Sequence, residues 1–204
     1  MNISYTNKSF EEINNWLKAN LNEERYMHSL GTMECAVELA EMFGADVEKA
    51  RTAGLLHDCA KCLPSEELIG IIKENICGVL DTEINSPKTL HAPVSAYFAK
   101  EKFGVEDEEI LSAIRWHTLG YCGMSEFDKI IFLADKIEPN TRPTEYRKVL
   151  LDILKEEEGL DKALFRCFSE TIKSLVERKL SICQITIDVY NELLNCVKPA
   201  NCIK

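Results

Sequence analysis

The sequence has few residues that interrupt regular secondary structure, with only nine glycines and six prolines in 204 residues. Such a composition favours long regular elements over loops. No segment alternates apolar and polar residues as strands require, and no apolar run approaches the roughly 18 residues of a membrane span. The chain is therefore expected to form one all-α domain over residues 1–204, a single helical bundle without a membrane-spanning segment.

Positive charge is also scarce. Lysine and arginine together number 24 against 34 aspartates and glutamates, which gives a net charge of −10. Phosphate backbones are held mainly by clustered Lys and Arg side chains, so this balance disfavours nonspecific nucleic-acid binding. An anionic substrate would need local positive charge, supplied by metal ions or by a few basic residues.

No secretory leader is recognisable, because the first residues, Met1-Asn2-Ile3-Ser4-Tyr5-Thr6-Asn7-Lys8, are polar. The nine cysteines are an odd number and follow no disulfide framework. Cys59 and Cys62 form a Cys-x-x-Cys pair, but it lacks both a thioredoxin-like context and a second pair, and we interpret it as coincidence. The expectation is a reduced, cytoplasmic protein.

Capping residues and apolar stripes predict nine or ten helices. Ser9 and Asn22 begin the first two, the second of which ends at Gly44, and Asp46 begins the third. The segment 75–89 is predicted to be a loop, because glycine, asparagine and proline interrupt any period. The remaining helices should begin near residues 64, 91, 106 and 125, and span about 144–157, 161–179 and 186–196.

Only four histidines occur, and each lies on its own predicted helix. His28 is in line with an apolar stripe of Cys35, Leu39 and Met42, and should face the core. The other three lie at predicted helix ends, and they are His57, His91 and His117. A single histidine in such a place is usually a hydrogen-bonded core residue. Four such histidines on separate helices are harder to explain in that way.

Two aspartates complete this pattern. Asp58 follows His57 directly, and because adjacent helical side chains point about 100° apart, both can reach one point only where the helix ends. Gly54, one turn before Asp58, leaves room for another helix or for a bound ion. Asp135 lies on an apolar stripe, where an unpaired carboxylate is costly and needs a cation. Imidazoles and carboxylates are common metal ligands, so the six residues raise the hypothesis of a metal site.

Three motifs surround these residues: Arg25-Tyr26-Met27-His28-Ser29-Leu30-Gly31, Leu56-His57-Asp58-Cys59-Ala60-Lys61 and Leu133-Ala134-Asp135-Lys136-Ile137-Glu138-Pro139. Together they resemble the HD superfamily of metal-dependent phosphohydrolases, an all-helical fold, and within it the bacterial symmetrical dinucleoside tetraphosphatases of the YqeK type. His91 and His117 match the two intermediate histidines of that branch. The resemblance runs from about Arg25 to the C-terminus. It implies a motif core over about 25–142, with C-terminal helices over 144–196 packed on it.

The resemblance implies a metal centre. One ion would be held by His28, His57, Asp58 and Asp135. Asp58 would either bridge to a second ion on His91 and His117, or those two histidines would contact the substrate phosphate directly. The branch is usually described as binding iron, whereas the ligand types alone are compatible with divalent or trivalent iron, with manganese or with zinc.

The resemblance also implies catalytic and substrate-binding roles. Asp58 and Lys61 are the expected catalytic residues, although Lys61 could instead be a solvated surface lysine. Arg142 is the expected phosphate clamp. In that branch the arginine stands nearer to the proline than Arg142 does in this chain, so Arg147 is kept as the alternative. The expected substrate contacts are His28, Asp58, Cys59, Ala60, Lys61, His91, His117, Asp135, Lys136, Arg142, Ser181 and Ile182.

The activity implied by the resemblance is hydrolysis of diadenosine tetraphosphate and related dinucleotides at the middle anhydride, giving two nucleoside diphosphates. Two alternatives stay open. The first is an HD phosphohydrolase acting on a nucleoside monophosphate or a nucleotide second messenger, and the second is a nucleotide-binding regulator without turnover. The expected partners are a nucleotide substrate and its product, with neither nucleic acid nor membrane, and a homodimer is left open.

Overall fold

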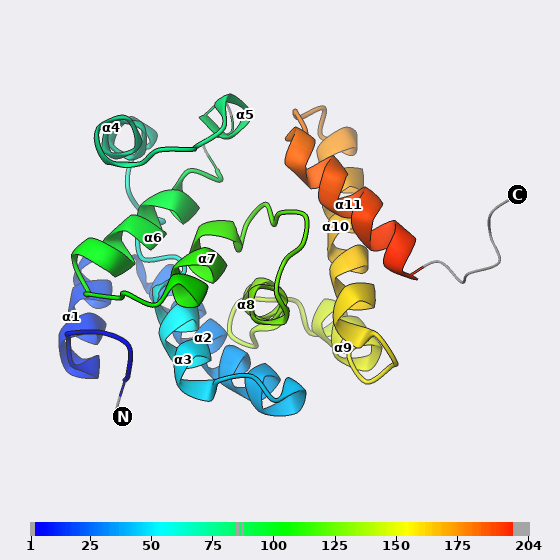
Figure 1. Cartoon of the computed structure of the whole chain (residues 1–204), viewed down its shortest axis with the longest axis horizontal. Helices are drawn as coiled ribbons and strands as arrows, with labels where there is room; N and C mark the ends of the chain where they lie inside the picture. The colour runs from blue at the N-terminus through cyan, green and yellow to red at the C-terminus, as the bar shows by residue number, and fades with distance from the viewer. Residues whose placement is uncertain (1–2, 85, 87, 198–204) are drawn as a thin grey trace, which may run out of the picture.

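The computed structural model describes residues 3–84, 86 and 88–197, and this part of the chain contains eleven helices and no strand (Figure 1). The all-α prediction is therefore confirmed. The helices are α1 (Phe10–Asn20), α2 (Glu23–Phe43), α3 (Val47–Leu56), α4 (Ser65–Asn75), α5 (Asp81–Ile84), α6 (His91–Glu101), α7 (Glu108–Trp116), α8 (Glu126–Ile137), α9 (Thr144–Ile153), α10 (Gly159–Glu177) and α11 (Gln184–Val197).

Local hydrogen bonds explain where several helices begin and end. The Asn22 side chain accepts a hydrogen bond from the amide of Arg25 at the start of α2. Asp46 does the same at the start of α3, where it accepts from two backbone amides. Gly44 ends α2 with a φ of 73°, a left-handed conformation that favours glycine. These boundaries depend on near neighbours in sequence, so they were predictable.

Three expectations about the helices are wrong. The segment 75–89 contains α5, a single turn that its buried Glu83 fixes by pairing with Arg115 of α7. The helix predicted over 144–157 ends at Ile153, and Glu158, with a φ of 56°, lies outside both α9 and α10. Met42 is 54% exposed. Residues spaced seven apart on a straight helix rotate by about 20° per step. Met42 is two such steps after His28, so its side chain has turned off the buried face.

Helices α2, α3 and α8 pack against one another and form the centre of the bundle. Gly54 permits the close approach of α3, because a Cβ atom there would lie 2.8 Å from the Cα of Met33 and 3.0 Å from the carbonyl oxygen of Thr32. The space left by Gly54 therefore accommodates a neighbouring helix. Of the two alternatives open from the sequence, an adjacent ion is not the reason for this glycine.

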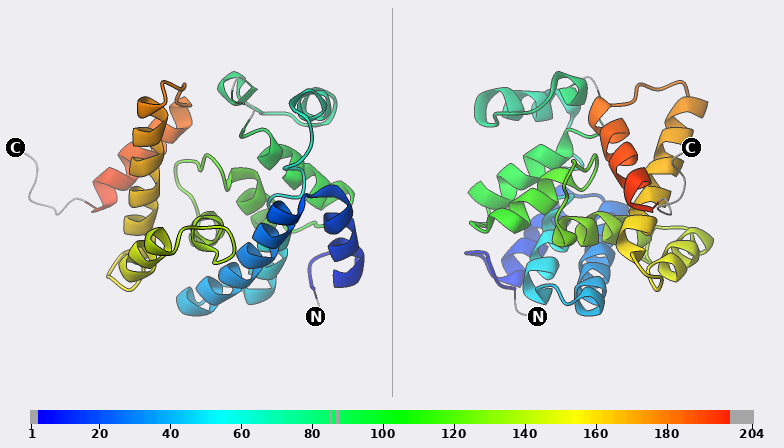
Figure 2. Two further views of the ribbon diagram at one scale, coloured as in Figure 1. Left: turned by 180° about the vertical axis from the view of Figure 1, so that it is seen from behind. Right: turned by 45° about the vertical axis from the view of Figure 1, so that its right-hand side comes forward.

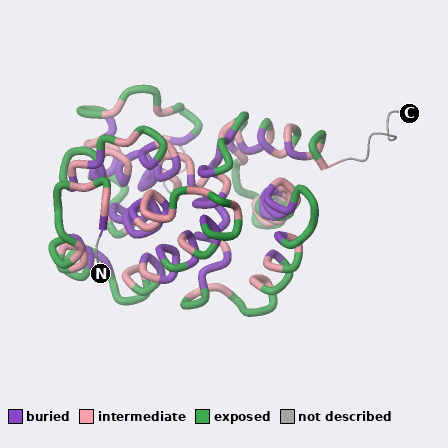
Figure 3. Tube along the Cα trace, turned by 60° about the horizontal axis from the view of Figure 1, so that its bottom comes forward, coloured by how far each residue is buried: buried purple, intermediate pink, exposed green. Residues whose placement is uncertain are grey.

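The other helices surround this centre. Helices α6 and α7 pack against each other, and α10 packs against α8, α9 and α11 (Figure 2). Buried residues line the inner sides of the helices, whereas most connecting segments are exposed (Figure 3). Among the described residues, none of the helices has the length and apolar character needed to cross a membrane. The ends of α3 and α7, the start of α6 and one side of α2 and α8 meet in the interior.

Candidate metal centre

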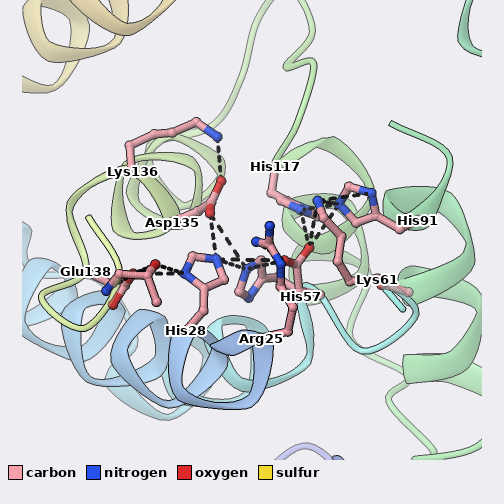
Figure 4. Close-up of polar contacts among 12 residues, drawn as sticks. Arg25, His28, His57, Lys61, His91, His117, Asp135, Lys136 and Glu138 are labelled. Atoms are coloured by element: carbon pink, nitrogen blue, oxygen red, sulfur yellow. Dashed lines mark hydrogen bonds and ion pairs between the residues drawn. The ribbon is translucent and has the colours of Figure 1, made fainter. Parts of the chain in front are cut away.

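All four histidines and both aspartates of the predicted set meet at this point, and none is more than 5% exposed (Figure 4). His28 lies in the second turn of α2, and His57 caps the C-terminal end of α3, with Asp58 directly after it. His91 begins α6, and His117 caps the C-terminal end of α7. Asp135 comes from the last turn of α8. Five helices thus bring together residues spread over more than half of the chain.

Four of these residues form a first cluster. The Nε2 atoms of His28 and His57 are 3.2 Å apart. Oδ1 of Asp135 lies 2.9 Å from Nε2 of His28 and 3.9 Å from Nε2 of His57, and Oδ2 of Asp58 lies 3.8 Å from both nitrogens. Donor atoms about 2.0–2.2 Å from one metal ion can be separated by no more than about 4.4 Å. The spacing in this cluster meets that condition.

The second carboxylate oxygen of Asp58 faces a second cluster. Its Oδ1 lies 2.9 Å from Nε2 of His91 and 3.3 Å from Nε2 of His117, and these two nitrogens are 3.2 Å apart. Asp58 therefore stands between two pairs of imidazoles with one oxygen toward each pair. Both clusters have the types of donor atom and the spacing that could hold a metal ion.

The backbone orients two of the imidazoles. Nδ1 of His57 donates a hydrogen bond to the carbonyl of Gly54 at 2.8 Å, and Nδ1 of His117 donates to the carbonyl of Ile114 at 2.7 Å. Each donation places the hydrogen on Nδ1 and leaves the lone pair of Nε2 directed into the centre, which is the form that binds metals. Burial lowers the pKa of His57 to about 3, so this imidazole is neutral at physiological pH.

His28 is oriented by a side chain, Glu138, that the sequence interpretation missed. Glu138 is fully buried, and its Oε1 accepts a hydrogen bond from Nδ1 of His28 at 3.0 Å. The same carboxylate accepts from the amides of Asn140, at 2.6 Å, and Thr141, at 2.9 Å. Gly31 leaves room for it, because a Cβ there would lie 2.5 Å from Oε2 of Glu138. A signal was present in the sequence, since Glu138 stands one helical turn after Asp135 in the same motif.

Three of the predicted cationic residues lie at the centre. Nζ of Lys136 is 2.5 Å from Oδ2 of Asp135, and Arg142 donates to Oδ1 of Asp135 at 2.6 Å and to its carbonyl at 2.7 Å. Burial raises the pKa of Asp135, but Lys136, His28 and Arg142 together hold it well below its usual range. Arg147 donates instead to the carbonyl of Ile137. Of the two arginines considered from the sequence, Arg142 is the one at the centre.

Lys61 is the third of these cations. Its Nζ lies 3.0 Å from Nε2 of His91 and 3.7 Å from Oδ1 of Asp58, and its side chain is 26% exposed. Burial lowers the pKa of its ammonium group. The alternative of a freely solvated surface lysine is therefore wrong, because the turn after α3 brings Lys61 back toward Asp58.

Two further residues of the predicted substrate-binding set face elsewhere. Cys59 and Ala60 are buried. The thiol of Cys59 donates to the carbonyl oxygen of Ser95, and the amide of Ala60 donates to the hydroxyl of Ser95. These contacts attach the turn after α3 to α6. The Cys59 thiol therefore points toward α6, because the tight turn that directs Asp58 inward rotates the next side chain away.

A cavity of about 360 Å³ lies beside the centre, between the loop after α7 and the C-terminal helices. Thr118, which follows His117, forms part of its wall, as do the stacked rings of Phe132 and Phe168, whose centroids are 5.1 Å apart. Ser181 is also in the wall, whereas the half-buried Ile182 is not among its lining residues. Among the described residues, the buried hydroxyl of Thr118 has no hydrogen-bond partner.

Comparison with known proteins agrees with this geometry. The model of the HD domain family matches residues 25–140, a segment that contains every residue of both clusters. The chain belongs to the HD family. The match ends before α9, so the cavity wall contributed by α10 and the loop after it lies outside the matched segment of this HD protein.

Relatives of this HD protein are similar over nearly its full length. It is 39% identical over 178 residues to a symmetrical bis(5'-nucleosyl)-tetraphosphatase from Halalkalibacterium halodurans, covering 87% of this chain and 93% of the relative. It is 40% identical over 184 residues to a protein of the same name from Bacillus subtilis, covering 88% and 94%. The resemblance inferred from the three motifs is confirmed.

A solved structure has the same fold. It is described as a "predicted HD superfamily hydrolase involved in NAD metabolism" from Clostridium acetobutylicum. The two chains are 39% identical and superpose with a TM-score of 0.87, and the similarity covers 93% of this chain and 98% of the other. The prediction of a single-domain HD-type bundle is therefore confirmed.

Proposed function

We propose that this HD protein hydrolyses dinucleoside tetraphosphates, diadenosine tetraphosphate above all, at the middle anhydride to give two nucleoside diphosphates. The observation that carries the proposal is the buried centre, in which six ion ligands lie beside three cationic side chains. It occurs in a chain 39–40% identical to two symmetrical tetraphosphatases. Phosphoanhydride hydrolysis requires both activation of water and neutralisation of phosphoryl charge.

The proposed ion is iron, held by His28, His57, Asp58 and Asp135, and manganese or zinc suits the same ligands. When bound, the ion supplies Lewis acidity, which activates water and neutralises charge on phosphoryl oxygens. His91 and His117 either hold a second ion with Asp58 or contact the phosphate directly. Nε2 of His91 lies 2.9 Å from Oδ1 of Asp58 and Nε2 of His117 lies 3.3 Å from it, and both distances are compatible with either arrangement.

In the proposed reaction, the oxygen of water attacks an inner phosphorus atom and the bridging P–O bond on its far side breaks. Asp58, which is buried and central, orients the reacting groups. The ammonium of Lys61 donates to the departing oxygen or to a phosphoryl oxygen, where negative charge develops. Arg142 binds the phosphates with its planar group of donors. One water is consumed, and its two hydrogens end on the two diphosphate products.

The cavity is the proposed site for one nucleoside. Its volume falls within the range of about 300–1,000 Å³ that is common for ligand pockets. Phe132 and Phe168 supply an apolar wall for a base, and the hydroxyl of the exposed Ser181 supplies a polar contact at its edge. Since Thr118 adjoins His117, a nucleotide in the cavity would place its phosphates next to the ion ligands.

Product analysis by chromatography tests the proposal. With iron or manganese present, diadenosine tetraphosphate should yield ADP alone. ATP plus AMP, or the absence of turnover, would reject it. A nucleoside monophosphate and a cyclic dinucleotide in the same series test the alternative substrates. Tight ADP binding without any turnover would instead favour the non-catalytic regulator.

Several other expectations remain predictions. They are a cytoplasmic location, a homodimer, the lack of nucleic-acid binding that follows from the net charge of −10, and a motif core over about 25–142 with the helices of 144–196 packed on it. Sedimentation of the purified protein would test the homodimer, and a binding assay with DNA would test the lack of nucleic-acid binding.

A further inference from the structure

The cations at the centre include a fourth member, and together they form two pairs. One pair, Lys136 and Arg142, lies within 2.6 Å of the carboxylate of Asp135. The other two cations, Arg25 and Lys61, approach the carboxylate of Asp58. Arg25 lies 3.8 Å from Oδ2, the oxygen that faces the first cluster, and Lys61 lies 3.7 Å from Oδ1, the oxygen that faces the second. Each pair comes from two different segments of the chain.

Arg25 has no part in the site as predicted from the sequence. It extends from the first turn of α2 toward the centre, and its side chain is 32% exposed (Figure 4). Within residues 3–84, 86 and 88–197, no hydrogen bond from its guanidinium group is found, because 3.8 Å to Oδ2 of Asp58 exceeds hydrogen-bond length. Its charge and its five donors are therefore available to an anionic ligand.

The cavity lies away from the segments that carry Arg25 and Lys61. Its lining residues come from the segment before α6, the loop after α7, α8, α10, the loop between α10 and α11, and the start of α11, and none comes from α2 or from residues 57–63. Nζ of Lys136 lies 5.0 Å from the ring centre of Phe132, a residue of the cavity wall. A nucleotide in the cavity would thus have its phosphates near Lys136 and Arg142, with Arg25 and Lys61 beyond them.

Resting on the proposed function, we infer that Arg25, together with Lys61, binds the diphosphate half of the dinucleotide that lies outside the cavity. Cleavage at the middle anhydride leaves two phosphates on each side of the broken bond, so both halves need cationic partners. A guanidinium group matches phosphate oxygens in a bidentate way. Arg25 is therefore a substrate-binding residue that distinguishes a tetraphosphate dinucleotide from a mononucleotide.

The test compares two probes on the intact, ion-loaded protein. The first is diadenosine tetraphosphate with a methylene group in place of the middle bridging oxygen, and the second is ADP, which occupies the cavity half. Arg25→Ala should weaken binding of the analogue by about 10- to 100-fold, the range of a lost charge-assisted hydrogen bond, and leave ADP binding at the wild-type level. Arg25→Lys, which keeps the charge but loses the planar group, should recover part of the loss.

The matched control is Arg166→Ala, which removes an exposed arginine from α10. It should bind both probes as the wild type does. An Arg25→Ala variant with unchanged analogue binding, or with equal losses for both probes, overturns the assignment. Loss of bound ion from this variant, measured by metal analysis, also overturns it, since Arg25 would then support the centre and not the substrate.

The two proposals can fail separately, because the analogue requires no turnover. If the wild type binds the analogue but hydrolyses no dinucleotide, the hydrolase proposal fails and the Arg25 comparison still decides this inference. If the wild type hydrolyses diadenosine tetraphosphate and Arg25→Ala does so with unchanged KM, only the assignment of Arg25 fails. If the wild type binds no analogue, the assignment of Arg25 is rejected, and the product assay still decides the hydrolase proposal.

Discussion

Replacing Glu138 with alanine tests how far the ion centre depends on a residue that is not itself a ligand. The carboxylate of Glu138 accepts from Nδ1 of His28 at 3.0 Å, and both side chains are fully buried. Without this acceptor, the group left to accept from Nδ1 of His28 among the described residues is the hydroxyl of Thr141, at 3.3 Å, which is long for a hydrogen bond, whereas the amide of the exposed Asn140 can bond to solvent. The variant should therefore lose both the orientation of one ligand and a buried hydrogen bond.

The magnitudes follow from these two losses. Removing a hydrogen-bond partner from a metal-ligating histidine costs about 10- to 100-fold in ion affinity. Leaving one buried donor unsatisfied costs about 1–3 kcal/mol of stability. For a chain of this size each kcal/mol corresponds to about 2–4 °C in Tm. The ion-free Glu138→Ala variant should thus melt a few degrees below the wild type.

The assay has two independent readouts. Ion affinity is measured by competition between the protein and a chelating dye for Mn²⁺, and Tm is measured in excess EDTA. Glu138→Gln keeps a carbonyl that can accept from His28, so its affinity should lie between those of the alanine variant and the wild type. Glu145→Ala, at an exposed position of α9, is the control and should change neither value.

One result would refute the reasoning. If Glu138→Ala melts at a lower temperature in EDTA but binds Mn²⁺ as tightly as the wild type, Glu138 stabilises the loop after α8 and does not orient His28. Gly31→Ala provides a second route to the same question. Its added Cβ would lie 2.5 Å from Oε2 of Glu138, so displacement of the carboxylate should reproduce part of the affinity loss.

Three further predictions concern the centre and the helix packing. Asp135→Asn should lower the affinity for the ion by more than the roughly 10- to 100-fold expected for Glu138→Ala, because it removes a charged candidate ligand. Metal analysis that shows full ion content in this variant would contradict the prediction. Ion at 100 times its Kd should stabilise the wild type by about 2.7 kcal/mol, and EDTA should abolish this gain in a thermal melt; a Tm that EDTA leaves unchanged would argue against the ion site. Gly54→Ala should destabilise the protein by about 1–3 kcal/mol, because its Cβ meets the backbone of α2 at 2.8 Å, and an unchanged urea midpoint would show that the helices can separate at little cost.

The sequence by itself determined most of the helix boundaries and indicated which six residues would come together as candidate ion ligands. Caps such as Asn22 and Asp46 act through hydrogen bonds to amides two or three residues away, so their effect is present in the local sequence. The candidate ligands could be recognised because a buried carboxylate on an apolar stripe is costly without a cation, and because each of the four histidines lies on its own predicted helix. Both the chemistry of these residues and their place on the helices indicated the site.

Only the tertiary structure decided which other residues support that centre. The hydrogen bond between Glu138 and His28 joins residues 110 apart in sequence. The motif places Glu138 one turn after Asp135, but it does not show that the partner of Glu138 is His28. The same holds for Arg25, which reaches Asp58 from another helix, and for Thr118, whose buried hydroxyl lacks a partner among the described residues. These roles depend on how helices cross, and crossing geometry is set by side-chain packing summed over the whole core.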